Sequence, residues 1–573
     1  MATKAVELAR WQSALQSGDI HRIATTARRL ADEKSKIDTS FRFTVCDKLW
    51  TPVGEVGEDL MIASGTDVRN DCPTGTLQLK GGSKLIDAFM GCRTTLVGVI
   101  VETAGLRFPY YVKKHTYKYE DSAWTGTAEL KGIWDILNYY TIWPSWFLPI
   151  QAQPFSHAVF MWALCTVLEN MVAECALRIQ SGIWEFVNNA LSLNPDIRAW
   201  FGTLLQSNGN IFQMLKTPMY VTRTNPLLDT SPLVGRTVRM ESCGTVIKDI
   251  TRAYGVDTRV DLWLPGDEQP DRWANLNQPT YVFSTKDRSQ IEGPTKTVLD
   301  SALRTVIDLE GSLLGRVMDP ILNPTPNPAL PNDSFDMFEA QRLGLHFAPP
   351  YAIVVAPEDG EDSPIISCEI TDHTPEGWQH VIGGRSPKWL NDIMNAFYAW
   401  MIDALMILIG ITGVPSDLLS GFLNNAFFAF QLIQHYERRA EVGPYHPNVE
   451  TFTATASAPY NVETLFAFIN KLYDTRGYTS AIVRFYASGE SAPYKLGRDI
   501  FKGGLMSLVY RSRTKMYTDY IEQLMWRITP DERELLVQLG DGKRDEAPLA
   551  KHQRFITAAF EAINVLTLAP QSG

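Results

Sequence analysis

The sequence predicts a multidomain α+β protein, with β domains of the sandwich or barrel type at both ends of the chain and helical blocks inserted between them. Short runs of β-branched and aromatic residues, separated by Gly, Pro and Asp, recur near both ends of the chain, and such runs are typical of strands in sandwiches and barrels. Two apolar segments between them repeat at helical spacing. The length of 573 residues is enough for three or four packed units.

Six parts are predicted in chain order. They are N-terminal helices (1–37), a first β domain (38–132), a Trp-rich helical block (133–215), a mixed α/β domain (216–386), an apolar helical hairpin (387–440) and a second β domain that ends in a helix (441–573). In the first part, apolar residues recur at helical spacing from Val6 to Ala31, and Gly18 predicts a break between two short helices.

The Trp-rich block begins with "IWDILNYYTIWPSWFLPI" and continues with "FSHAVFMWALCTVLENMVAECALRIQSGIWEFVNNAL", which we expect to be helical. Aromatic residues are enriched at subunit interfaces and also in the belts that lie at membrane surfaces. The block therefore supplies a candidate aromatic interface. Its residues are Trp134, Tyr139, Tyr140, Trp143, Trp146 and Phe147.

The mixed domain is expected to contain a helix in "SCGTVIKDITRAYG", strands in "TRVDLWLPG" and "PTYVFSTKDRS", and a further helix from Thr297 to Leu314. Acidic residues recur between Asp257 and Asp271. Oxygen-rich loops of this kind can hold calcium, but the alternation with apolar residues favours a strand with one solvated face. No metal site is predicted, and a bound ion near these residues stays open.

The stretch "LMILIGITGVPSDLLSGFLNNAFFAFQLI" carries a single charge, Asp417, in 29 residues. Pro415 disfavours helix at Val414, and Ser416 is a good N-cap, so two helical arms are predicted instead of one continuous span. The candidate buried or membrane-inserted residues of this hairpin are Leu405, Ile407, Leu408, Ile409, Ile411, Pro415, Leu418, Leu419, Phe422, Phe427, Phe428 and Phe430.

Such apolar arms must be covered either by protein or by lipid. The first interpretation is that the hairpins pack against copies from neighbouring subunits of an oligomer. The second is that they enter a membrane when they are released. The uncharged part of the first arm, Ala404 to Val414, is shorter than the roughly 20 residues that a bilayer span needs.

Composition and motifs indicate a structural protein without a cofactor. The net charge of −11 argues against tight binding of phosphate backbones. Seven scattered cysteines without a CxxC pair form neither a zinc cluster nor a disulfide framework. No phosphate loop, dinucleotide fingerprint, HExxH or GxSxG motif occurs, so no catalytic residue is assigned and no enzyme is predicted. The first residues lack the pattern of a secretory signal, so synthesis in a cytoplasm is expected.

Several segments together resemble the tail-associated hub, or minor tail, proteins of long non-contractile-tailed phages that infect actinobacteria. They are "FTVCDKLWTPVGEVGEDL", "TYVFSTKDRSQIEGPTKTVLDSALRTVIDLEGSLLG", "VPSDLLSGFLNNAFFAFQ", "LYDTRGYTSAIVRFYASGESAPYKLGRDIFKGG" and "VQLGDGKRDEAPLAK". The resemblance extends with gaps over most of the chain and includes no catalytic signature.

The resemblance implies a virion protein at the tail tip, made in the host cytoplasm, that forms a three-fold hub below the tail tube. Its β domains would continue the tube, and its partners would be its own copies, the distal tail protein, the tape-measure protein and other minor tail proteins. DNA would pass transiently through the hub during infection, and contact with the host membrane is a further expectation. A membrane-active tail-tip protein and a tail-tip cell-wall hydrolase are the alternatives.

Overall fold

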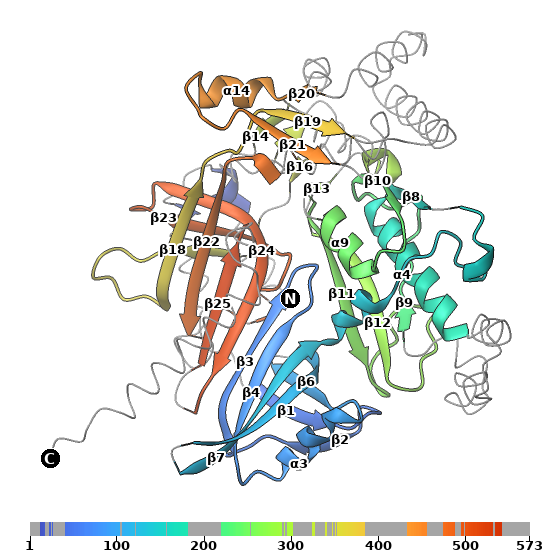
Figure 1. The fold of residues 1–573 in the computed structure, drawn as a ribbon. Coiled ribbons are helices and arrows are strands. Elements are labelled where there is room, and N and C mark those ends of the chain that lie inside the picture. Colours follow the sequence, from blue (N-terminus) through green and yellow to red (C-terminus); the bar gives the residue numbers. More distant parts are fainter. Residues whose placement is uncertain are drawn as a thin grey trace. The chain divides into compact units, whose positions relative to one another are not determined.

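The chain forms two compact units in the computed structural model (Figure 1). Apart from short internal gaps and a few shorter pieces, the structure describes residues 12–17, 41–181, 219–301, 352–383, 432–454 and 474–540. Unit 1 is built from both ends of the chain and one middle segment, namely residues 1–135, 350–372 and 479–573. Unit 2 contains residues 136–349 and 373–478. The six predicted parts stay a prediction, and the boundaries of the two units do not follow them.

Unit 1 contains a 13-stranded sheet. Its N-terminal strands are β1 (Phe41–Cys46), β2 (Pro52–Glu55), β3 (Leu60–Val68), β4 (Thr74–Lys80), β5 (Gly98–Thr103), β6 (Leu106–Glu120) and β7 (Ala123–Gly132). Its later strands are β17 (Ala352–Val355), β18 (Ile365–His373), β22 (Tyr478–Tyr486), β23 (Leu505–Tyr510), β24 (Lys515–Ile528) and β25 (Arg533–Leu539). The short helices α3 (Leu85–Met90) and η1 (Gly91–Arg93) connect β4 to β5.

The strand order brings the two ends of the chain together. It runs β18-β22-β25-β24-β3-β4-β7-β6-β5-β1-β2, with β23 on β24 and β17 on β23. The N-terminal and C-terminal strands meet where β3 pairs antiparallel with β24, with the register running from Val68↔Gln523 to Ala63↔Ile528. We call this junction the β3–β24 seam.

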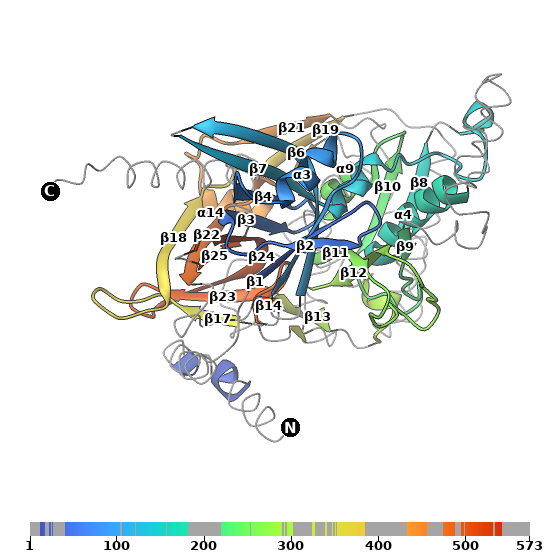
Figure 2. The ribbon, with the colours of Figure 1, turned by 90° about the horizontal axis from the view of Figure 1, so that it is seen from below.

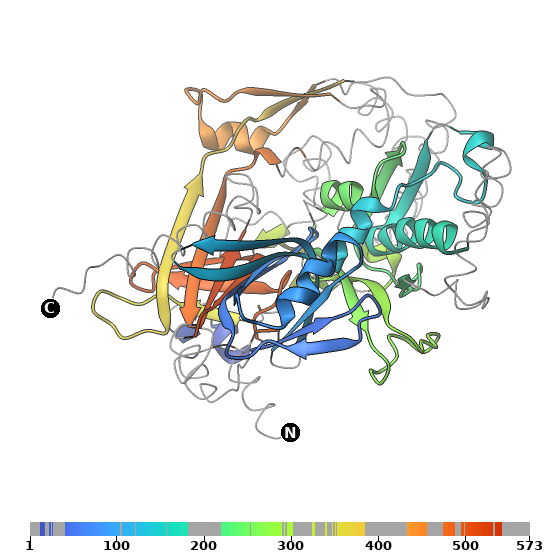
Figure 3. The ribbon, with the colours of Figure 1, turned by 60° about the horizontal axis from the view of Figure 1, so that its bottom comes forward.

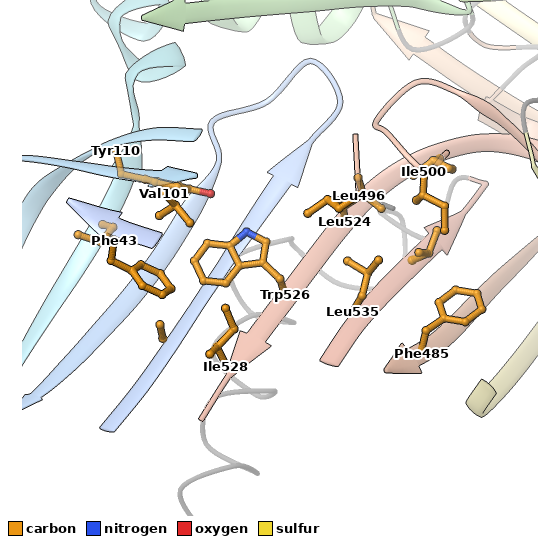
Figure 4. Close-up of a cluster of buried hydrophobic side chains, with 14 of the residues drawn as sticks. Phe43, Val101, Tyr110, Phe485, Leu496, Ile500, Leu524, Trp526, Ile528 and Leu535 are labelled. Carbon is orange, nitrogen blue, oxygen red and sulfur yellow. The ribbon is translucent and has the colours of Figure 1, made fainter. Parts of the chain in front are cut away.

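Trp526 occupies the centre of the core at this seam (Figure 4). Its ring lies 5.7 Å from that of Phe41, 5.9 Å from that of Phe43 and 6.5 Å from that of Tyr110, measured between centroids. In Figure 4 the indole lies between the side chains of the N-terminal strands and those of the C-terminal strands. One apolar core is thus shared by segments that lie more than 400 residues apart, and burial of aromatic area is a dominant stabilising term in such a core.

Unit 2 combines helices with small sheets. Its N-terminal elements are η2 (Ile133–Tyr139, which begins in unit 1), η3 (Ile150–Ala152), β8 (Ala158–Ala163), α4 (Leu164–Ser181), β9 (Met219–Val221), β10 (Leu233–Val238), α9 (Cys243–Thr251), β11 (Val256–Trp263) and β12 (Thr280–Asp287). Shorter pairs are β13 (Ile291–Glu292) with β16 (His346–Phe347) and β14 (Pro324–Pro326) with β15 (Phe338–Ala340). The remaining elements are β19 (Gln379–Gly383), β20 (Leu432–Gln434), α14 (Tyr436–Val442) and β21 (Glu450–Ala454).

The helix α4 is the central element of unit 2. It contacts β8, β9, β10, β12 and α9 (Figures 1 and 3). Asp229 fixes its first turn by accepting hydrogen bonds from the Thr166 N–H at 2.9 Å and the Thr166 hydroxyl at 2.7 Å. A carboxylate that accepts from orphan N–H groups at a helix N-terminus also complements the helix dipole.

The segment predicted as a helical block after residue 133 contains a strand that the sequence did not indicate. Residues Ile133–Tyr139 form a 3₁₀ helix, and Ala158–Ala163 form strand β8, which pairs antiparallel with β10. The sequence "AVFMWA" is apolar throughout, so its periodicity does not separate a buried strand from the first turns of the helix that follows. Pairing with the distant segment Leu233–Val238 decides for the strand.

The predicted apolar hairpin lies almost entirely outside the described residues. All twelve of its candidate residues fall within 384–431, and so does its predicted turn. The end of the predicted segment is described and forms strand β20 and helix α14. The predicted C-terminal helix also lies outside the described part, which ends at residue 540. No helix in the described part of the chain combines the length and the apolar character needed to span a bilayer.

Candidate interaction surfaces

The outer part of the β6–β7 hairpin extends from the sheet of unit 1 (Figure 2), and most of the residues at the end of β6 and the start of β7 are exposed or half-buried. β6 is 15 residues long, but only its first six residues, Leu106 to Tyr111, pair with β5. Beyond Tyr111 the strand pairs with β7 alone, as far as the tip pair Glu120↔Ala123. The outer part of the hairpin is therefore a two-stranded ribbon whose β6 edge has no further strand beside it among the described residues.

Aromatic rings line this ribbon. The rings of Tyr117 and Trp124 stack with their centroids 4.6 Å apart and an interplanar angle of 10°. Tyr119 lies 5.2 Å from Trp124 on the tip side, and His115 lies 6.5 Å from Tyr117 on the other side. The exposed fractions of Tyr117, Tyr119 and Trp124 are 37%, 58% and 49%. We call these four side chains the hairpin aromatic surface.

Hydrogen bonds to Gly81 and a ring contact with Phe89 fix the side chains of the hairpin aromatic surface. The Tyr117 hydroxyl donates a hydrogen bond to the Gly81 carbonyl at 3.0 Å, and the Gly81 N–H donates to the Trp124 carbonyl at 2.8 Å. Gly81 has no room for a side chain, because an added Cβ would lie 2.3 Å from Trp124 Cβ. The ring of Phe89 on α3 supports His115, with centroids 5.8 Å apart. Rings that are already ordered lose little conformational entropy when a partner binds.

Charges flank the rings but largely offset one another. Lys114 pairs with Glu129 at 2.9 Å and Lys118 with Glu120 at 2.5 Å. All four side chains are exposed, so these pairs contribute little to folding. Exposed, ordered Tyr and Trp side chains with polar residues around them are the composition of binding hot spots between proteins. The hairpin can therefore supply a docking surface for another protein.

The six residues of the predicted aromatic interface divide into three groups. Trp134 and Tyr140 are buried within the chain, while Tyr139 and Phe147 are 66% and 57% exposed. Trp143 and Trp146 are half-buried. The guanidinium carbon of Arg178 lies 4.0 Å from the centroid of Trp143, and the rings of Trp146 and Phe147 meet edge to face at 5.9 Å. Their role between subunits stays a prediction.

The hairpin aromatic surface was missed as a site in the sequence, where "FPYYVKKHTYKYED" predicts only a strand. A signal was available in the sequence. Tyr117 and Tyr119 lie on one face of the strand, hydrophilic residues lie between them on the other face, and Trp124 follows shortly after. An alternating strand whose same-face residues are aromatic, but which is flanked by Lys on both faces, indicates rings that are not in a core.

The β3–β24 seam carries buried ion pairs in both directions. Arg69 of the N-terminal segment pairs with Glu522 of β24, while Lys502 pairs with Asp67 of β3 at 3.2 Å. The Arg69 guanidinium also lies 5.0 Å from the centroid of Tyr520. Each half of the sheet thus gives the other one cation and one anion. A buried charge that loses its partner is costly, so these two ion pairs favour the observed register over a shifted one.

The acidic cluster of the mixed domain does not gather around one point. Asp257 is fully buried on β11, 3.5 Å from Arg259 Nε and 4.0 Å from Arg288 Nε, so the predicted solvated face of this strand begins only at Asp261. Asp267 accepts from the Leu264 N–H and Asp271 from the Tyr220 hydroxyl. Within the described ranges, no group of three or more His, Cys, Asp or Glu side chains is arranged to hold a metal ion.

Comparison with known proteins places the chain in a class, that of phage tail proteins. Residues 42–541 match the family described as Siphovirus ReqiPepy6 Gp37-like protein, and the chain belongs to this family. The match covers both halves of the unit 1 sheet and all the described part of unit 2. No curated protein matches the sequence.

Three of the solved structures to which the chain is similar are the following. The tail protein from Neisseria meningitidis MC58 is 7% identical, with 88% of this chain and 97% of that chain covered and a TM-score of 0.39. The 43 kDa tail protein of prophage MuSo2 from Shewanella oneidensis is 8% identical, with 87% and 98% covered and a TM-score of 0.38. The lidded PdpA–VgrG complex of Francisella is 7% identical, with 91% and 56% covered and a TM-score of 0.33.

Proposed function

We propose that this chain is a structural minor tail protein that forms an oligomeric hub at the tip of a siphophage tail. The observation that carries the proposal is the 13-stranded sheet of unit 1, in which both ends of the chain join at a seam of buried ion pairs. A sheet of this extent can form a wall of the hub. In the described part of the chain, its terminal strands β2, β17 and β18 each pair with one strand only, so a neighbouring chain could pair with their other edges. Membership of a phage tail protein family supports a place in the virion.

Three copies around the tail axis would make the hub. Closed symmetry lets identical surfaces cover one another, and it would give the apolar residues of 405–430 a place between subunits. The distal tail protein, the tape-measure protein and other minor tail proteins are the partners proposed for its outer faces. DNA would pass through the centre, where the net charge of −11 disfavours adhesion of the phosphate backbone. The proposed host is an actinobacterium.

The hairpin aromatic surface is the proposed contact with a neighbouring tail protein. Its Tyr117, Tyr119 and Trp124 rings contact one another and are exposed to solvent, and two ion pairs, Lys114–Glu129 and Lys118–Glu120, lie within the hairpin. Such a surface gains free energy mainly by burying aromatic area, with little cost from unpaired charge. This contact would bind the hub to its neighbours independently of residues 405–430.

Copy number tests the hub directly. Mass measurement of native tails or isolated tail tips should give three copies of the chain per virion. One copy per virion would exclude a homo-oligomeric hub. The variant Ile407→Asp should reduce assembly if residues 405–430 are buried between subunits, because an unpaired buried charge costs several kcal/mol.

The proposed role involves no catalysis and no cofactor. A zymogram on host peptidoglycan should show no clearing by the purified chain, and clearing would favour a tail-tip hydrolase instead. The alternative of a membrane-active protein predicts leakage of liposomes that Leu408→Asp abolishes. The hub proposal predicts that the assembled oligomer leaves liposomes intact.

A further inference from the structure

Two cysteines meet inside unit 2, where α4 contacts the start of α9. Cys175 lies on α4, and Cys243 is the first residue of α9. Their sulfur atoms are 3.6 Å apart, and the Cys243 thiol donates to the Cys175 sulfur. Both side chains are buried. All seven cysteines belong to the described part of the chain, and all are free thiols. The sequence, with its seven scattered cysteines and no CxxC pair, predicts no disulfide framework and does not indicate this pair.

The backbone holds the two sulfurs in place. The Cys243 N–H donates to the Tyr140 carbonyl at 2.7 Å, and the Cys175 thiol donates to the Thr141 carbonyl at 3.4 Å. Both cysteines therefore form hydrogen bonds with neighbouring carbonyl groups of residues 140 and 141. A disulfide needs a sulfur–sulfur distance of about 2.05 Å. The two sulfurs are therefore roughly 1.5 Å farther apart than in a disulfide.

The surroundings give the two thiols different reactivity. The hydrogen bond from Cys243 lowers the pKa of Cys175, and the positive charge of Arg178 lowers it further. The same hydrogen bond and burial raise the pKa of Cys243. Arg178 is fixed next to the pair, because its Nη2 donates to the Thr141 carbonyl at 2.7 Å and its guanidinium stacks on Trp143. The thiol with the lower pKa is the better nucleophile toward an oxidant, and the other is suited to resolve the product.

We propose that Cys175 and Cys243 are an oxidation site, at which a peroxide converts the two thiols to a disulfide that joins α4 to α9. The Cys175 sulfur attacks one oxygen of hydrogen peroxide, so that an S–O bond forms, the O–O bond breaks and the Cys175 proton leaves with the departing hydroxide as water. The Cys243 sulfur then attacks the Cys175 sulfenic acid, an S–S bond forms, and the second hydroxide leaves as water with the Cys243 proton. The net reaction consumes two thiols and one peroxide and gives one disulfide and two waters.

The site suits a protein that leaves a cell. Disulfides are rare in a reducing cytoplasm and persist outside it. A phage protein is made in the first environment and acts in the second, so the bond would form after release and lock unit 2 in its assembled form. The proposal does not depend on the hub role.

The test counts thiols in the full chain. The reduced protein is freed of reductant, incubated with hydrogen peroxide and unfolded in the presence of an alkylating reagent. The mass of the intact chain is then measured by mass spectrometry. The expected result is a loss of two of the seven alkylated cysteines, and a peptide map without reductant should join the Cys175 and Cys243 peptides. Seven alkylated cysteines after oxidation, or a disulfide that joins other cysteines, would overturn the proposal.

Two variants separate the roles of the two thiols. In Cys243→Ser, Cys175 should stop at the sulfenic acid, which a dimedone reagent traps as one adduct per chain. Cys165→Ser removes another buried cysteine of α4, and the peroxide-dependent loss of two thiols should remain. Loss of the disulfide in Cys165→Ser would contradict the assignment. The wild-type peptide map decides the question even if a variant fails to fold.

Discussion

At the scale of single residues, the β3–β24 seam depends on side chains that match across the register. Gly65 lies directly opposite Trp526. An added Cβ at Gly65 would lie 2.2 Å from Trp526 Cζ2, and Phe41, Phe43 and Tyr110 leave the indole little room to move. The glycine is therefore needed for the close approach of an aromatic ring and not for an unusual backbone angle.

Gly65→Ala should destabilise unit 1. Overpacking of a filled core typically costs about 1–3 kcal/mol, so the midpoint of urea-induced unfolding, followed by circular dichroism, should fall. Gly57→Ala is the matched control, because an added Cβ there meets nothing within 4 Å, and its effect should stay within about 0.5 kcal/mol. Equal effects of the two substitutions would show that Trp526 does not hold the seam.

The ion pair between Arg69 and Glu522 gives a second prediction at this scale. Arg69→Met should cost about 3–5 kcal/mol, because it leaves the Glu522 carboxylate buried without its guanidinium. The double variant Arg69→Met, Glu522→Met should recover much of this loss, since no charge is then left unpaired. Lys114→Met breaks an exposed pair and should cost at most about 1 kcal/mol. Denaturant unfolding of the wild type, Arg69→Met, Glu522→Met and the double variant measures the coupling, and purely additive effects of the two substitutions would contradict it.

At the scale of elements, two buried neutral histidines lie in and beside the small sheet of β19, β20 and β21: His380 on β19, and His435, which follows β20 and caps helix α14. His380 Nδ1 lies 2.7 Å from the Thr451 hydroxyl, and burial, with the positive charges of Arg438 and Lys471, lowers the pKa of His380 to about 3. Burial and Arg438 lower the pKa of His435 to about 4. In the unfolded chain both rings would take up protons near pH 6.5.

Acid should therefore loosen this sheet. Between pH 6.5 and about 3 to 4 the unfolded chain binds protons that the folded sheet does not, so the stability present above pH 6.5 falls as the pH is lowered. Hydrogen exchange of the β19 and β21 amides, compared at pH 7.5 and pH 5 after correction for the intrinsic rate, should show lower protection at pH 5. His380→Asn should weaken this dependence. Protection that rises on acidification would contradict the assignment of neutral rings.

The β6–β7 hairpin leads to a prediction about assembly. Tyr119→Ser removes an exposed ring at the tip and should change the unfolding free energy by no more than about 0.5 kcal/mol. Incorporation of the variant into tails should fall severalfold, because an aromatic hot-spot residue typically contributes about 2 kcal/mol or more to binding. Tyr486→Ser, an exposed tyrosine at the end of β22, is the control. Normal incorporation of Tyr119→Ser would argue against docking through the hairpin.

The sequence predicted individual elements better than their partners. The strand segments near both ends carry β-branched and aromatic runs, a local signal, and helix α9 and strands β11 and β12 were expected where they occur. The pairing of β3 with β24 links residues about 450 positions apart, and no local pattern encodes it. Periodicity also does not show what covers a ring: Trp134 and Tyr140 are buried within their own chain, whereas Tyr139 beside them is exposed.

At the scale of the whole molecule, the central claim is that copies of unit 1 surround the axis of the tail. A density map of the intact tail tip tests it most directly. We expect three copies related by a three-fold axis below the last tube ring, with residues 405–430 covered by protein and the hairpin aromatic surface against a neighbouring tail protein. A map that shows a single copy, or that places the chain away from the tail tip, would contradict the proposed hub.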